Sequence, residues 1–199
     1  MRYRFTLLHS LYHWTLKWAA HPHAAWMLFF ISFIESSVFL IPPDVLLIPM
    51  TLTEPKRWFR FGLITTIASI LGGIAGYYIG YALWETVGKG VVAFYGLGDA
   101  MDLVQAKYQA NAFAAIFTAA LTPIPYKVFT ISAGLFHISL VTLIFASIIG
   151  RGLRFFAVAW LVGQFGEPVK DFIEKYFDIL TVAAAVLLVG GFLVVRLLI

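Results

Sequence analysis

Long apolar runs, separated by short charged connections, make up most of the chain. Residues 61–84 form one such run, residues 137–165 form a second that includes two arginines, and residues 177–196 form a third. A helix needs about 20 apolar residues to cross a bilayer. The pattern therefore predicts transmembrane helices over these three ranges.

Two further apolar runs, residues 24–53 and 112–135, are interrupted by prolines, which break helical hydrogen bonding. The first run is too long for one helix and too short for two complete spans. We predict that each run forms a re-entrant hairpin, which enters the membrane and returns to the side of entry; an ordinary helix with a proline kink is the alternative. The interrupting residues are Pro42 and Pro43 in the first run and Pro123 and Pro125 in the second.

The two interrupted runs resemble each other. "PPDVLLI" (42–48) and "IPYKVFTI" (124–131) each place a charge just after the prolines and before an apolar half-helix. One hairpin followed by one span makes an odd number of crossings, so the second copy must enter from the opposite side. The expected fold is therefore an all-α polytopic membrane protein with two opposed re-entrant helical hairpins in an inverted repeat.

The N-terminal residues 1–20 have the spacing of an amphipathic helix. One face has histidine or lysine at every fourth position, and another face has leucines and tryptophans: His9, His13 and Lys17 on the first, and Leu7, Leu11, Trp14 and Trp18 on the second. We expect this segment to lie in the membrane interface. A cleaved signal peptide is the alternative.

The composition agrees with a protein embedded in lipid. Hydrophobic residues make up 61% of the 199 residues, charged residues only 12%, and the mean hydropathy is +0.90. The net charge of +4 could suggest nucleic acid, but the basic residues flank apolar runs, so no nucleic-acid partner is expected. Because the chain has no cysteine, disulfides, thiolate metal sites and cysteine nucleophiles are excluded.

The charged connections predict the orientation. The short segment "KRWFR" (56–60) has three positive charges, and the N-terminal segment adds Arg2 and Arg4, whereas residues 85–107 have three acids and two lysines. Positive connections remain on the cytoplasmic side. We therefore expect a multi-pass protein of the inner (plasma) membrane with a cytoplasmic N-terminus.

Glu35 and Asp44 are the only formal charges in the apolar run 24–53. A charge at mid-membrane costs roughly 2.5 to 3.5 kcal/mol on insertion scales, so it is usually paired, protonated or functional. Lys127 is the expected partner, and Arg151 and Arg154 follow on the next helix. We predict a polar pocket for an anionic headgroup, with carboxylates that exchange protons. A structural ion-pair cluster that joins the two hairpins is the alternative.

Small residues recur at four-residue spacing in "GGIAGYYIG" (72–80), as Gly72, Gly76 and Gly80. Such a stripe lets another helix approach closely. We expect it to pack within the chain; homodimerisation through this face, and hence a homo-oligomer, is the alternative. No histidine lies at metal-ligand spacing with an acid on an intramembrane helix, so no metal site is expected.

In their order and spacing, these residues resemble the DedA superfamily, whose members are VTT-domain or SNARE-associated membrane proteins. The shared features are Glu35, the "PPD" segment, "GGIAGYYIG" and a second proline segment that ends in "SAG" (132–134). "TPIPYKVFTISAG" together with "GRGLRFF" (150–156) is most similar to the YqaA-like branch. The resemblance covers roughly residues 24–166, which we expect to form one VTT-like transport domain.

The resemblance implies opposed re-entrant hairpins and movement of phospholipids or polyprenyl phosphates, in many relatives linked to the proton motive force. Glu35 and Asp44 match the family's membrane acids. Lys127 approximates one of the second-hairpin arginines, and Ala120 stands in the place of the other, so Arg151 and Arg154 are candidates to replace it.

The expected function is therefore that of a lipid flippase or scramblase, with membrane lipids as its partners and with neither a cofactor nor an enzymatic activity. Two alternatives remain open. One is a small-solute or ion transporter built on the same hairpins, and the other is a scaffold for membrane homeostasis that transports nothing.

Overall fold

The computed structural model describes residues 23–38, 42–96, 98–122, 124–166 and 168. All regular structure in these ranges is helical, as the sequence predicts. The predicted amphipathic helix over residues 1–20 and the predicted transmembrane helix over 177–196 lie outside the described residues.

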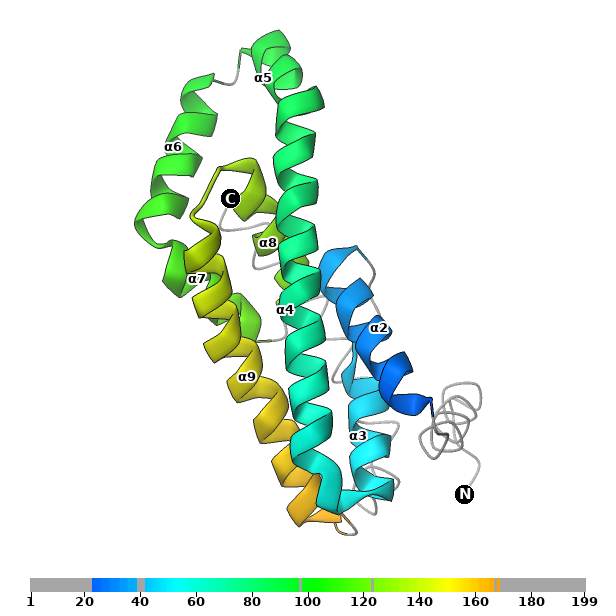
Figure 1. Ribbon diagram of the computed structural model, residues 1–199. Helices are drawn as coiled ribbons and strands as arrows, with labels where there is room; N and C mark the ends of the chain where they lie inside the picture. Colours follow the sequence, from blue (N-terminus) through cyan, green and yellow to red (C-terminus); the bar gives the residue numbers. More distant parts are fainter. Residues whose placement is uncertain (1–22, 39–41, 97, 123, 167, 169–199) are drawn as a thin grey trace, which may run out of the picture.

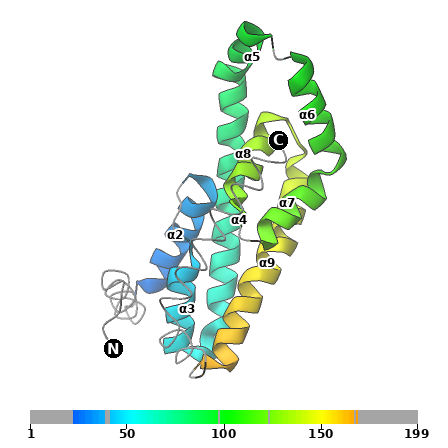
Figure 2. The same ribbon diagram turned by 180° about the vertical axis from the view of Figure 1, so that it is seen from behind.

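The first proline-interrupted run forms two helices, α2 (Ala24–Ser37) and α3 (Asp44–Thr53). Pro43 precedes α3, where its missing N–H removes no helical hydrogen bond, and its carbonyl accepts the N–H groups of Leu46 and Leu47. In both views α3 runs back toward the end of the molecule at which α2 begins (Figures 1 and 2). The run is thus two helices of opposite direction.

The second interrupted run has the same construction. It consists of α7 (Ala112–Leu121) and α8 (Tyr126–Leu135), separated by the extended Thr122 and by Pro125. In the views of Figures 1 and 2, α7 descends toward the middle of the molecule and α8 ascends from it. The tips of the two interrupted runs therefore point toward each other.

Two long helices connect these units. After the 3₁₀ turn η1 (Pro55–Arg57), α4 (Trp58–Leu83) continues through the π-helical turn η2 (Trp84–Gly88) into α5 (Lys89–Tyr95), and the chain turns through Gly96 into α6 (Gly98–Ala110). The second long helix is α9 (Leu140–Gln164). By length and composition, Pro55–Tyr95 and Leu140–Gln164 could each cross a membrane, where the sequence places spans over 61–84 and 137–165.

Each interrupted unit has its own apolar core against α9. Residues of α2 and α3, among them Leu28, Leu47 and Met50, pack with Phe61 of α4 and Phe155 of α9. Residues of α7 and α8 pack with the N-terminal half of α9 in a second cluster: Ala112, Ile116, Ala120, Tyr126, Ala133, Ile138, Leu143 and Ala146. The centre of α9 therefore lies between the two units.

The glycine stripe of α4 packs inside the chain. A Cβ on Gly72 would overlap the carbonyl oxygen of Phe33 in α2, and a Cβ on Gly80 would overlap that of Ile131 in α8. Gly76, between them, approaches Thr130 of α8. All three glycines are buried, so α2 and α8 occupy the face that the sequence offered for dimerisation.

We expect Gly80→Ala to lower the stability of the purified protein by about 3 kcal/mol, because the new methyl group has no space against backbone. Gly90→Ala is the matched control, since a Cβ there meets nothing within 4 Å. That change should be neutral or stabilise by up to about 1 kcal/mol, because alanine favours a helix. Thermal unfolding in detergent measures both, and equal midpoints would contradict the packing.

Candidate functional site

Arg151 of α9 and Glu35 of α2 form an ion pair at the centre of the molecule. One terminal nitrogen of Arg151 lies 3.2 Å from Oε2 of Glu35, and the two side chains are 2% and 17% exposed. Gly150, beside Arg151, approaches Ala120 and Phe117 of α7 so closely that a Cβ there would clash. The close contact of α9 with α7 thus positions the arginine between the two units.

Aromatic rings hold the guanidinium of Arg151. The ring of Tyr126, the first residue of α8, lies 4.1 Å from the guanidinium carbon, and the ring of Phe155 lies 5.4 Å away. The Tyr126 hydroxyl is hydrogen-bonded to the Ser147 hydroxyl one turn before Arg151. A planar guanidinium stacks well on such faces, so α8 supports an arginine whose charge is directed at α2.

Hydroxyl groups extend this polar centre toward α4. Ser36 Oγ donates to Glu35 Oε2 at 3.0 Å and lies 2.7 Å from Ser69 Oγ of α4. One turn earlier, Ser32 Oγ donates to the Thr65 carbonyl oxygen at 2.8 Å. The α2–α4 contact therefore contains a buried polar seam that ends at the ion pair.

A second ion pair joins the two helix breaks. Nη2 of Arg154 lies 2.7 Å from Oδ2 of Asp44, the first residue of α3. Nη1 of the same guanidinium donates to the carbonyl oxygen of Thr122, in the break between α7 and α8, at 3.2 Å. The side chains of Arg154 and Asp44 are 24% and 20% exposed. One residue of α9 therefore binds both tips.

The structure brings together these charged residues that the sequence singles out: Glu35, Asp44, Arg151 and Arg154. The sequence predicted Lys127 as a partner of the acids, and this stays a prediction; the ion pair that the structure shows at Asp44 is with Arg154. The physical reason is that α9 passes directly behind both breaks. Lys127 is half-buried in the first turn of α8, and its part in the site stays a prediction.

The prolines frame the cluster without contributing polar groups to it. Pro43 is buried and Pro42 is exposed before α3, and Pro125 is exposed before α8, whereas Pro123 lies outside the described residues. Breaks of this kind leave backbone carbonyls without helical partners. The Thr122 carbonyl, which accepts from Arg154, is the example at this site.

The sequence did not single out Tyr126, Ser36, Ser69 or Ser147 as functional residues. Serine and tyrosine are ordinary members of an apolar helix, so their presence alone gives no signal. The four-residue interval between Ser32 and Ser36, and between Thr65 and Ser69, was the one available indication of a polar face. Their pairing across helices depends on how α2 lies on α4.

The site suits recognition of an anion more than bond-breaking chemistry. Two guanidinium groups supply several directed N–H donors, and arginine binds phosphate oxygens in bidentate geometry. The two carboxylates form ion pairs with the two arginines. Among the described residues, no group of three or more histidines, cysteines or acids is arranged to hold a metal ion.

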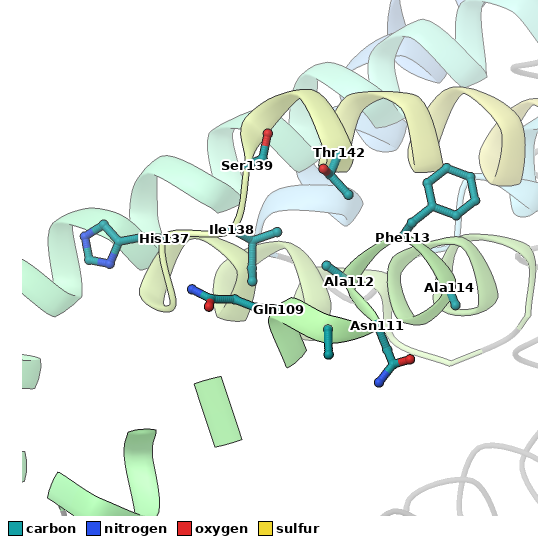
Figure 3. Close-up of a pocket in the computed structure, with 10 residues that line it drawn as sticks. Gln109, Asn111, Ala112, Phe113, Ala114, His137, Ile138, Ser139 and Thr142 are labelled. Atoms are coloured by element: carbon teal, nitrogen blue, oxygen red, sulfur yellow. The ribbon is translucent and has the colours of Figure 1, made fainter. Parts of the chain in front are cut away.

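A separate cleft of about 480 Å³ lies at the α6–α7 and α8–α9 corners (Figure 3). His137 lines it with a left-handed backbone, φ 53°, in the turn that ends α8. Its Nε2 lies 3.6 Å from Glu85 Oε1, and its ring packs on Tyr81. These contacts attach the α8–α9 corner to the end of α4, and the cleft shares no residue with the ion pairs.

Tyr108 attaches α6 to the same corner from outside the predicted membrane segments. Its hydroxyl donates to the Phe129 carbonyl oxygen at 2.8 Å. Burial raises the pKa of this phenol, so it remains a protonated donor at neutral pH. The hydrogen bond therefore holds α6 against α8 without introducing a charge.

Comparison with known proteins places the chain in a family. The VTT domain matches residues 41–164. An uncharacterized protein of Haemophilus influenzae is 34% identical over 187 residues, which are 94% of this chain and 97% of that protein. An uncharacterized homolog from Histophilus somni is 33% identical over 169 residues, 83% and 88% of the two chains. No solved structure matches. With more than half of its length matched, and with Asp44, Arg151 and Arg154 inside that range, the chain belongs to the VTT domain family of the DedA superfamily of membrane proteins.

Proposed function

We propose that this protein moves phosphate-bearing lipids across the membrane, as a flippase or scramblase. The observation that supports the proposal most is the cluster of two arginines and two acids between the two helix breaks. A charge cluster at the centre of an apolar protein is costly and usually functional. Phosphate is the anionic group of phospholipid and polyprenyl-phosphate headgroups, and arginine binds its oxygens well.

The proposal assigns roles to the charged residues. The phosphate approaches the guanidinium groups of Arg151 and Arg154, with Lys127 as an additional cation at the second break. Glu35 and Asp44 bind the arginines, and they gate the site or exchange protons during transport. Irregular backbone at the breaks is tolerated in a membrane because protein and a polar pathway cover it.

The topology that goes with this function is an inverted repeat. Each unit, α2–α3 and α7–α8, is a re-entrant hairpin that enters from its own side of the inner membrane, and α4 and α9 are the spans that follow them. The positive segment "KRWFR" faces the cytoplasm together with the N-terminus. Opposed hairpins of this kind place a transport site near the midplane, where both tips meet.

Reconstitution into liposomes tests the function. Purified protein is incorporated into vesicles with fluorescent phospholipids or a labelled polyprenyl phosphate, and the fraction of label exposed outside is followed with time. Lipid movement above that of protein-free vesicles is the expected result. Solute or ion flux without lipid movement would favour a small-solute transporter, and neither activity would favour a scaffold.

Cysteine labelling tests the topology in this cysteine-free chain. Cysteines at His23 and Pro55, on either side of the first unit, should both react with an impermeant reagent from the cytoplasmic side. Cysteines at Asn111 and Ser139, around the second unit, should react from the opposite side. All four positions are exposed. Labelling of His23→Cys and Pro55→Cys from opposite sides would overturn the hairpin topology.

A further inference from the structure

The geometry points to a division of labour between the two arginines, an inference that rests on the proposed function. Arg154 exchanges its partner: the substrate's phosphate displaces Asp44 from the guanidinium group, and the contact between the two helix breaks is lost. Arg151 keeps Glu35 throughout and acts as a positioning residue. Asp44 is thus an internal competitor of the ligand.

The two ion pairs differ in their exposure to solvent. The side chain of Arg151 is 2% exposed, stacked on Tyr126 and close to Phe155, whereas Arg154 is 24% exposed and its partner Asp44 is 20% exposed. A headgroup reaches Arg154 with little rearrangement. It reaches the guanidinium of Arg151 only by moving Tyr126 and the start of α8.

The bonding of Asp44 makes its replacement favourable. Its Oδ2 accepts from Arg154, but its Oδ1 is buried and has no hydrogen-bond partner among the described residues. A buried carboxylate oxygen without a hydrogen bond has lost its hydration and has gained no interaction that compensates for the loss. Release of Asp44 removes this desolvation cost, and the phosphate offers Arg154 more acceptor oxygens than the single oxygen that Asp44 supplies now.

The position of Arg154 turns this exchange into a conformational signal. The guanidinium binds Asp44 at the start of α3 and the Thr122 carbonyl in the α7–α8 break. A bidentate phosphate uses the same two terminal nitrogens. Its binding therefore breaks the link between the units, as alternating movement of two opposed units requires.

The same ligand chemistry is available from a lipid headgroup and from free phosphate, so the experiment uses both. Binding of inorganic phosphate and of dihexanoyl phosphatidylglycerol to purified protein is measured by titration calorimetry, with dihexanoylglycerol as the ligand that lacks phosphate. The variants are Asp44→Asn and Arg154→Gln. Glu54→Gln and Arg57→Gln are matched controls, because Glu54 and Arg57 form an exposed surface pair at 2.8 Å.

The two members of one ion pair should have opposite effects. Asp44→Asn should tighten phosphate binding about tenfold, because a ligand that needs the open state binds more tightly when that state is more populated. Arg154→Gln should weaken binding at least about tenfold, and both controls should bind like the parent protein. Arg154→Lys should bind phosphate more tightly than Arg154→Gln but more weakly than the parent protein. Lysine keeps the positive charge but lacks the planar guanidinium that binds two oxygens at once.

Equal or weaker binding by Asp44→Asn would overturn the inference, because an acid that merely supports the site would show that result. If Asp44→Asn does not accumulate as folded protein, Asp44→Ser makes the same test with a smaller neutral side chain. The proposed function can fail independently. Tightened binding of inorganic phosphate without binding of the lipid would keep the exchange at Arg154 and exclude a lipid substrate.

Discussion

Replacing Arg151 by methionine is expected to destabilise the protein by about 3 to 5 kcal/mol, because it leaves Glu35 as an uncompensated charge in a buried site. Arg151 is among the largest fully buried side chains of the described residues, and its loss also removes the partner of the Tyr126 ring. Thermal unfolding of purified protein in detergent measures the effect.

The double variant separates charge from packing. Glu35→Gln combined with Arg151→Met removes both charges, so it should be more stable than the sum of the single effects allows. Arg57→Met is the control, since its ion pair with Glu54 is exposed and contributes only about 0 to 1 kcal/mol. If the effects of Glu35→Gln and Arg151→Met on the free energy of unfolding simply add, the two charges do not stabilise each other.

Neutralising the acids should nearly abolish lipid transport, with initial rates reduced about a hundredfold or more in the vesicle assay. Glu35→Gln removes the acceptor that orients Arg151, and Asp44→Asn removes the acid that must take Arg154 back from the phosphate. A tenfold change in rate corresponds to about 1.4 kcal/mol, so the loss of one charge-assisted hydrogen bond is large enough.

Insertion into the membrane should be unaffected by either acid change, because both remove a charge from an apolar environment. Glu54→Gln, at the exposed pair, should transport like the parent protein. Asp44→Asn should bind phosphate tightly and transport lipid slowly. This combination is expected if Asp44 competes with the phosphate for Arg154, and it is not expected if Asp44 merely helps to bind the substrate. Normal transport by both acid variants would show that the acids have a structural role alone.

Much of the architecture follows from local properties of the chain. Uncharged runs of sufficient length predict α4 and α9, and the helices α3 and α8 begin directly after Pro43 and Pro125. The family also follows from short segments in a fixed order, which the VTT domain match confirms. These features were predictable because hydropathy and the missing N–H of proline act on the residues that possess them.

The glycine stripe illustrates an intermediate case. The spacing of Gly72, Gly76 and Gly80 predicted a close helix contact but left open whether the partner was another chain. The structure places α2 against the first glycine and α8 against the last. Sequence spacing defines a face, whereas the occupant of the face depends on the packing of the whole molecule.

The pairing of charges was decided by tertiary structure alone. Arg151 and Arg154 lie 116 and 110 residues after their acids, and nothing in the spacing of the sequence marks them as partners. The sequence by itself determined which groups are charged in an apolar protein. Their partners depend on the passage of α9 behind both breaks, since electrostatic attraction acts over distance in space and not over separation along the chain.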